Sequence, residues 1–139
     1  MKKQAVKAVK KIAVYAALIV CASCLGALGA KEKNMQKNSF STISAQEAKA
    51  RMDKGGVIIV DVRTQAEYDS GHIPGAIVIP NETIGSSRPA QLPDLNAEIL
   101  VYCRSGARSR NAAGKLAALG YTAIYDFGGI ISWPYEVVK

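Results

Sequence analysis

The chain is poor in the side chains that build disulfide frameworks and metal sites. Its 139 residues contain three cysteines, one histidine and one tryptophan. Cys21 and Cys24 lie in an apolar N-terminal segment, which leaves Cys103 as the single cysteine of the remaining chain. A disulfide framework is excluded there because Cys103 has no partner. A zinc site built on cysteine is also unsupported, since His72 is the only histidine. We expect neither a metal nor a cofactor.

Acidic residues are absent from the first thirty positions, which hold five lysines. The lysines precede residue 12, and residues 12–30 form an uncharged stretch rich in Ala, Leu, Ile and Val that ends in small residues. A basic start, an apolar middle and a small-residue end are typical of a secretory signal peptide. We expect residues 1–30 to be such a signal, with cleavage after Gly29 or Ala30.

Two alternatives to a cleaved signal stay open for this segment. Ala22-Ser23-Cys24 resembles the end of a bacterial lipoprotein box, which would place a lipid on Cys24, although Cys21 stands where that box usually carries leucine. The apolar stretch is also just long enough to span a bilayer as an uncleaved anchor. Each alternative exports the domain. We therefore expect it in the periplasm or on the outer face of the cytoplasmic membrane, touching the membrane only through this segment.

The net charge of +7 comes mostly from the N-terminal segment. Without its five lysines, residues 31–139 hold 13 basic and 11 acidic residues, a net charge of +2. A nearly neutral domain lacks the broad basic surface that binds phosphate backbones. We therefore do not expect nucleic-acid binding.

The remaining chain is long enough for one small folded domain. Residues 31–41 are a polar linker, and residues 42–139 are expected to form the domain. Capping boxes at Ser44-Ala45-Gln46-Glu47 and Thr64-Gln65-Ala66-Glu67 predict helices over 45–54 and about 65–71. Apolar runs predict a helix over 109–119 and strands over 57–60, 76–79, 99–102 and 122–126. Strands alternating with short helices predict an α/β domain with a largely parallel sheet. Ligands bind such sheets at the C-terminal edge of the strands.

Cys103 opens the run CRSGARS, residues 103–109, between an apolar strand and an alanine-rich helix. Unpaired N–H groups at the start of a helix, together with the helix dipole, favour negative charge at the centre of such a loop. Arg104 and Arg108 bracket the same loop. All three effects favour the reactive thiolate over the thiol. The sequence therefore predicts that Cys103 is a nucleophile and not a buried packing residue.

Four motifs cover roughly residues 42–139. They are Asp61-Val62-Arg63 with Glu67-Tyr68, GHIPGA at 71–76, CRSGARS at 103–109, and Gly128-Gly129-Ile130 with Trp133. Taken together, they resemble the rhodanese-like sulfurtransferases. The resemblance implies an α/β rhodanese-like fold, with a mainly parallel five-stranded sheet and helices on both faces. It also implies that Cys103 takes the outer sulfur of a donor such as thiosulfate. The resulting persulfide would pass that sulfur to cyanide or a thiol.

The resemblance also assigns roles to individual residues. The catalytic cysteine is Cys103, and the persulfide and the small anionic donor are held by Arg104, Ser105, Gly106, Ala107 and Arg108. Asp61 and Arg63 are expected to pair as structural support, with direct catalysis as the lesser alternative. His72 is expected to fix its turn through a hydrogen bond, with general-base catalysis as the lesser alternative. Trp133 is expected to be a core or lid aromatic.

The motifs leave other functions open beside that of an enzyme. A persulfide carrier would hand sulfur from Cys103 to one protein partner, and an interaction-only domain would have no need of the cysteine and two arginines.

Related phosphatases place one extra residue between the cysteine and the closing arginine. Here four residues separate Cys103 from Arg108, so phosphatase or arsenate-reductase chemistry is the lesser alternative.

An exported thiolate without a resolving cysteine is open to oxidation, so we also expect a thiol-reducing protein as a partner.

Overall fold

The computed structural model describes residues 39–139, so the predicted export segment, with Cys21 and Cys24, lies outside the described residues. The elements in chain order are β1 (Ser41–Thr42), α2 (Ala45–Lys54), β2 (Val57–Asp61), α3 (Gln65–Ser70), β3 (Ile77–Val78), the 3-10 turn η2 (Asn81–Thr83), β4 (Glu98–Cys103), α4 (Ala107–Ala118), β5 (Ala123–Gly129) and the 3-10 turn η3 (Ile130–Ser132). Within the described part of the chain, no helix is long and apolar enough to cross a membrane.

The strands form a five-stranded sheet in the order β1-β5-β4-β2-β3, and each neighbouring pair is parallel. This confirms the predicted α/β fold with a mainly parallel sheet. The continuous apolar runs of β2 and β4 suit strands that are covered on both faces. The edge strand β1 begins at Ser41, the last residue of the predicted linker, and pairs with β5. Its two residues are polar and carry no apolar pattern that a sequence analysis could detect.

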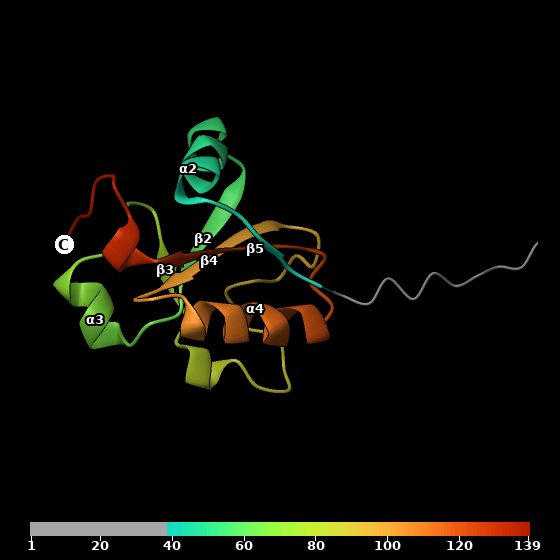
Figure 1. Cartoon of the computed structure of the whole chain (residues 1–139). Helices are drawn as coiled ribbons and strands as arrows, with labels where there is room; N and C mark the ends of the chain where they lie inside the picture. Colours follow the sequence, from blue (N-terminus) through green and yellow to red (C-terminus); the bar gives the residue numbers. More distant parts are fainter. Residues whose placement is uncertain (1–38) are drawn as a thin grey trace, which may run out of the picture. The chain divides into compact units, whose positions relative to one another are not determined.

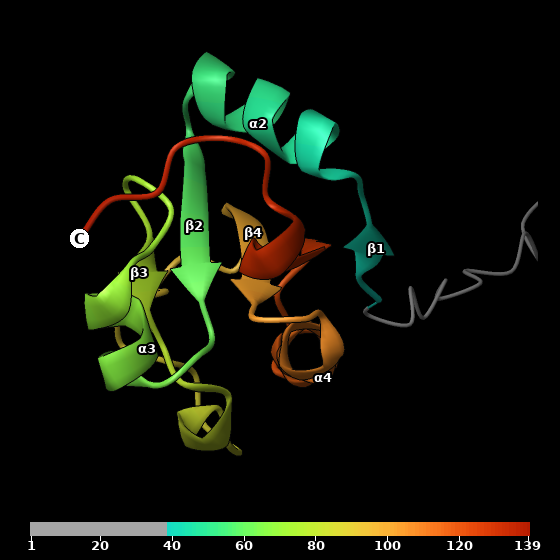
Figure 2. The same cartoon turned by 60° about the vertical axis from the view of Figure 1, so that its left-hand side comes forward.

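Helices cover both faces of the sheet, with α2 on one side and α4 on the other (Figure 1). Because successive side chains of a strand point to opposite faces, β4 contributes to two cores. Ile99 and Val101 pack in the core that contains Leu116 of α4. Leu100 and Tyr102 pack in the core that contains Ala48 of α2 and the aromatic rings of Phe127 and Trp133. The carboxyl ends of β2 and β4 reach the same edge, where α3 and the start of α4 lie (Figure 2).

The helix after the cysteine loop begins earlier than predicted. The sequence placed its start at Ser109, whereas α4 begins at Ala107, directly after Gly106. Gly106 has a φ angle of +106°, a backbone conformation that glycine adopts without steric cost. The chain therefore turns from β4 into the helix within a few residues, which brings the first turn of α4 to Cys103.

Candidate active site

Cys103 is the last residue of β4, and its side chain lies inside the turn that leads into α4. The Gly106 N–H donates a hydrogen bond to the Cys103 Sγ, with a distance of 3.0 Å between the two heavy atoms. Cys103 is only 1% exposed. The thiol therefore lies at the carboxyl edge of the sheet, as the sequence predicts, and is held at the N-terminus of a twelve-residue helix.

The local hydrogen bonds favour the charged form of this cysteine. Burial raises the pKa of the Cys103 thiol, but hydrogen bonds from the backbone and hydroxyl of Ser109 and from the backbone N–H groups of Gly106 and Ser105 outweigh that effect. The pKa of Cys103 is therefore below its ordinary value. The sequence predicts that Arg104 and Arg108 contribute to this effect. In the structure, the largest favourable contributions come from the donors of the loop and of α4.

Titration of the Cys103 thiolate is expected to show this effect directly. Because the pKa of Cys103 is lowered, thiolate absorbance in the ultraviolet should reach half its maximum at a lower pH than it does for an unperturbed cysteine. The signal of Cys103 is the difference between wild type and Cys103→Ser. The Ser109→Ala variant loses a hydroxyl that bonds Asp126 and is one of the causes that lower the pKa of Cys103, so its midpoint should move to higher pH. The matched control is Ser70→Ala, whose hydroxyl bonds only Glu67 O. Equal midpoints in wild type and Ser109→Ala would contradict the assignment.

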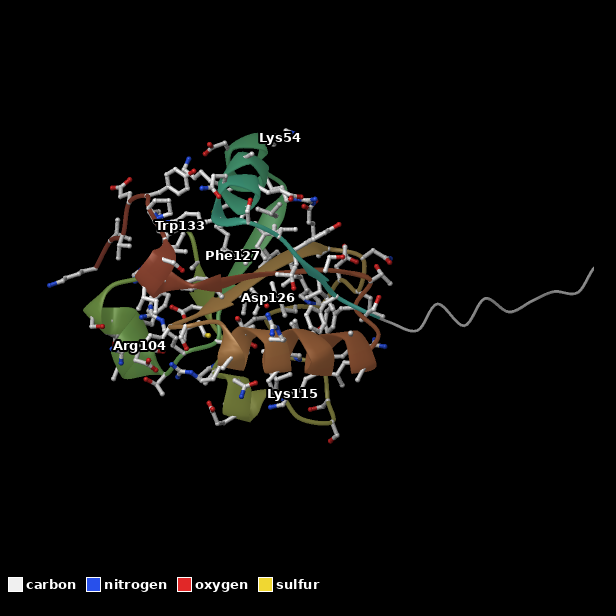
Figure 3. The ribbon with its side chains drawn as sticks, in the orientation of Figure 1. Lys54, Arg104, Lys115, Asp126, Phe127 and Trp133 are labelled. Atoms are coloured by element: carbon white, nitrogen blue, oxygen red, sulfur yellow. The ribbon has the colours of Figure 1, made fainter. Side chains whose placement is uncertain are left out.

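A buried carboxylate ties the start of α4 to β5. Asp126 is 1% exposed, and its Oδ1 accepts hydrogen bonds from the Ser109 hydroxyl at 2.7 Å and from the Gly128 N–H at 3.1 Å. Asp126 therefore lies between β5 and α4 (Figure 3). No sequence pattern assigns a role to Asp126 or Ser109. The available sequence signal was an acidic residue, Asp126, within an apolar strand.

The cysteine loop packs directly against the end of β5. Cys103 is in register with Gly129, and the Ile131 N–H donates to the Arg104 carbonyl at 3.2 Å. A Cβ on Gly129 would overlap the carbonyl oxygen of Arg104 and lie 2.6 Å from the Ser105 Cα. The second glycine of the predicted Gly128-Gly129 motif is thus required by the close approach of two backbones.

The two arginines of the loop have different surroundings. Arg104 is exposed and lies at the end of the molecule where α3 and the start of α4 meet (Figure 3). Arg108 forms a bidentate ion pair with Glu67 of α3, with both nitrogen–oxygen distances 2.8 Å. The resemblance implies that both arginines bind the donor, and the sequence predicts only a capping role for Glu67. The structure pairs Arg108 with a carboxylate and leaves Arg104 facing the solvent.

The expected support residues are buried or half-buried near this edge. Asp61 and Arg63 form the predicted pair, with 2.6 Å between Oδ2 and Nη2, and Arg63 also donates to the Gly71 carbonyl at 2.7 Å. The His72 Nδ1 lies 3.0 Å from the Tyr68 carbonyl oxygen, and the two rings stack. These contacts fix the turn after α3.

The other residues that the resemblance assigns a role lie either in the core or at the surface of the loop. Trp133 is 9% exposed and packs against Phe127, so it is a core aromatic. Ser105 and Ala107 are exposed at the surface of the loop. Among residues 39–139, no three His, Cys, Asp or Glu side chains come together as metal ligands would.

The fold and the site define a class of protein: an α/β domain with a parallel sheet, in which a buried thiol lies at the end of a strand, before a short loop and a helix. A family model described as a rhodanese-like domain matches residues 44–134. The chain therefore belongs to the rhodanese-like sulfurtransferases, which confirms the resemblance. A curated sulfurtransferase from Allochromatium vinosum is 40% identical over 82 residues, which cover 58% of this chain and 75% of that protein.

Solved structures of sulfurtransferases have the same fold. A rhodanese with anions from E. coli is 35% identical, covering 59% of this chain and 96% of that chain, with a TM-score of 0.54. A human single-domain sulfurtransferase is 30% identical, covering 63% of this chain and 88% of that chain, with a TM-score of 0.58. The described domain is therefore similar to nearly the whole of these small proteins.

Proposed function

We propose that this protein transfers sulfane sulfur from a small anionic donor, thiosulfate or a persulfide, to cyanide or a thiol through a persulfide on Cys103. The observation that carries the proposal is the hydrogen-bonded position of the Cys103 Sγ at the start of α4, where the pKa of the thiol is lowered. Membership of a sulfurtransferase family supports the reaction class. The compact loop between Cys103 and Arg108 favours sulfur over phosphate chemistry.

The reaction has two displacement steps at sulfur. The Cys103 thiolate attacks the outer sulfur of thiosulfate, the S–S bond of the donor breaks, and sulfite leaves with the bonding electron pair. The acceptor, cyanide or a thiolate, then attacks the outer sulfur of the persulfide. The Cys103 thiolate leaves, and thiocyanate or an acceptor persulfide is released. The loop N–H groups stabilise negative charge on sulfur before and after each step, and the exposed Arg104 is available to the donor's oxygens.

The place of action is part of the proposal. The basic start and uncharged stretch of residues 1–30 support export, with the domain acting in the periplasm or on the outer face of the cytoplasmic membrane. A thiol-reducing protein would restore Cys103 after oxidation, because Cys103 is the only cysteine among residues 31–139.

Intact-mass spectrometry of the full chain tests the transfer. Incubation with thiosulfate should add the mass of one sulfur atom, and peptide mapping should place it on Cys103. Cyanide should then remove the sulfur and release thiocyanate. A chain that gains no sulfur from thiosulfate or from a persulfide donor would rule out the proposed function. A persulfide that neither cyanide nor small thiols can discharge would identify a carrier instead.

A further inference from the structure

Glu67 holds the charge of Arg108 in a fixed arrangement. Its carboxylate accepts two hydrogen bonds from Arg108 and two more from the backbone N–H and hydroxyl of Thr64, the latter at 3.0 Å each. Hydrogen bonds from Arg108 are the largest cause of a Glu67 pKa far below the ordinary value. Glu67 therefore carries its negative charge throughout the pH range in which a thiolate reacts.

The ion pair reaches the cysteine loop through Arg108, and four residues separate Arg108 from Cys103 along the chain. Arg108 lies in the first turn of α4, at the end of the cysteine loop. Its pKa is raised mainly by the hydrogen bonds to Glu67 and further by the negative charges of Cys103 and Glu82. The positive charge of Arg108 is thus opposed by acidic groups of α3 and η2. In the described part of the chain, Arg104 has no carboxylate within ion-pair distance.

We propose that Glu67 is a specificity residue, which sets the preference of Cys103 for sulfur donors of low charge by neutralising Arg108. The inference rests on the proposed function and deepens it. Each negative charge on a donor is attracted by Arg108 and repelled by the Glu67 carboxylate next to it, so the two effects oppose each other. The site therefore gains little from the second charge of a dianion. Singly charged donors, such as hydropersulfide anions and thiosulfonates, compete well with thiosulfate.

Two donors that differ in charge measure this preference. Thiosulfate is a dianion and leaves as sulfite, whereas methanethiosulfonate is a monoanion of similar shape that leaves as methanesulfinate. In both cases the Cys103 thiolate attacks the outer sulfur, the S–S bond breaks, and its electron pair leaves with the sulfur–oxygen group. The ratio of the two kcat/KM values, with cyanide as acceptor, reports the effect of the extra charge. It is independent of the fraction of active enzyme.

The test variant is Glu67→Gln in the full chain. Glutamine keeps the shape and can still accept the Thr64 N–H hydrogen bond of the capping box. Removing one negative charge should raise the ratio of kcat/KM for thiosulfate to kcat/KM for methanethiosulfonate about threefold, because one partly exposed charge interaction has an effect of about this size. The increase should shrink at high ionic strength because of screening. The matched control is Asp69→Asn, which removes a charge from the same helix but whose carboxylate bonds Gln65.

The opposite substitution keeps the inference testable if Glu67→Gln folds poorly. Arg108→Gln leaves the Glu67 charge unbalanced, so the ratio should fall below that of wild type. An unchanged ratio in both variants, or an equal change in Asp69→Asn, would overturn the specificity role while wild type still transfers sulfur. Absence of transfer from both donors in wild type would instead overturn the proposed function, and this inference with it.

Discussion

Replacing Cys103 with serine is expected to abolish sulfur transfer, with a loss of at least about a thousandfold in kcat/KM. A serine hydroxyl is a far weaker nucleophile at neutral pH and cannot form a persulfide. The intact mass of Cys103→Ser should stay unchanged after incubation with thiosulfate. Because serine is similar in size and the Gly106 N–H can bond its oxygen, the thermal unfolding temperature should change little. The loss then reflects chemistry and not unfolding.

The control for this prediction uses the other two cysteines of the chain. A double variant with serine at Cys21 and Cys24 should keep the full sulfur gain and the full rate, because both residues belong to the predicted export segment. Sulfur that remained on Cys103→Ser, or a rate close to that of wild type, would show that Cys103 is not the nucleophile.

Gly129→Ala is expected to disable the site although it changes no residue of the cysteine loop. The new methyl group would collide with the Arg104 carbonyl and lie 2.6 Å from the Ser105 Cα, so the cysteine loop must move away from β5. Overpacking of this kind costs about 1–3 kcal/mol of stability. A displacement of the nucleophile by about 1 Å costs about a hundredfold in rate. Thermal unfolding and the cyanide assay measure the two effects.

Gly85→Ala is the matched control for that substitution. A Cβ at Gly85 meets no atom within 4 Å, and the residue has no positive φ angle. Its unfolding temperature and rate should therefore equal those of wild type. Wild-type behaviour of Gly129→Ala would show that the loop and β5 tolerate a side chain between them, and that the close approach does not position Cys103.

Local sequence patterns were sufficient to predict most of the scaffold. The β-branched run of β2 and the capping residues Ser44 and Thr64 encode their elements within a few residues, and the structure has each of them where it was predicted. The position of Cys103 at a strand end followed from the same patterns. These predictions hold because neighbouring residues alone determine the periodicity and the cap.

Contacts between distant residues explain what the sequence could not show. Glu67 and Arg108 are 41 positions apart and meet only because the carboxyl ends of β2 and β4 share one edge. The Ser109–Asp126 hydrogen bond depends on how α4 packs against β5. No pattern within either segment indicates the partner. These charge and hydrogen-bond interactions of the site could therefore be identified only from the three-dimensional structure.

The burial of Cys103 affects which sulfur atom of a Cys103 persulfide an acceptor could attack. With 1% of the residue exposed, Sγ offers almost no surface to a bulky thiol. A persulfide adds a second sulfur atom at a bond length of about 2 Å, and this terminal atom is the one nearer to an arriving acceptor. Attack at the inner sulfur, which would leave the acceptor joined to the protein as a mixed disulfide, is hindered sterically. In the proposed reaction, burial of the cysteine would therefore direct attack to the outer sulfur and favour a released product.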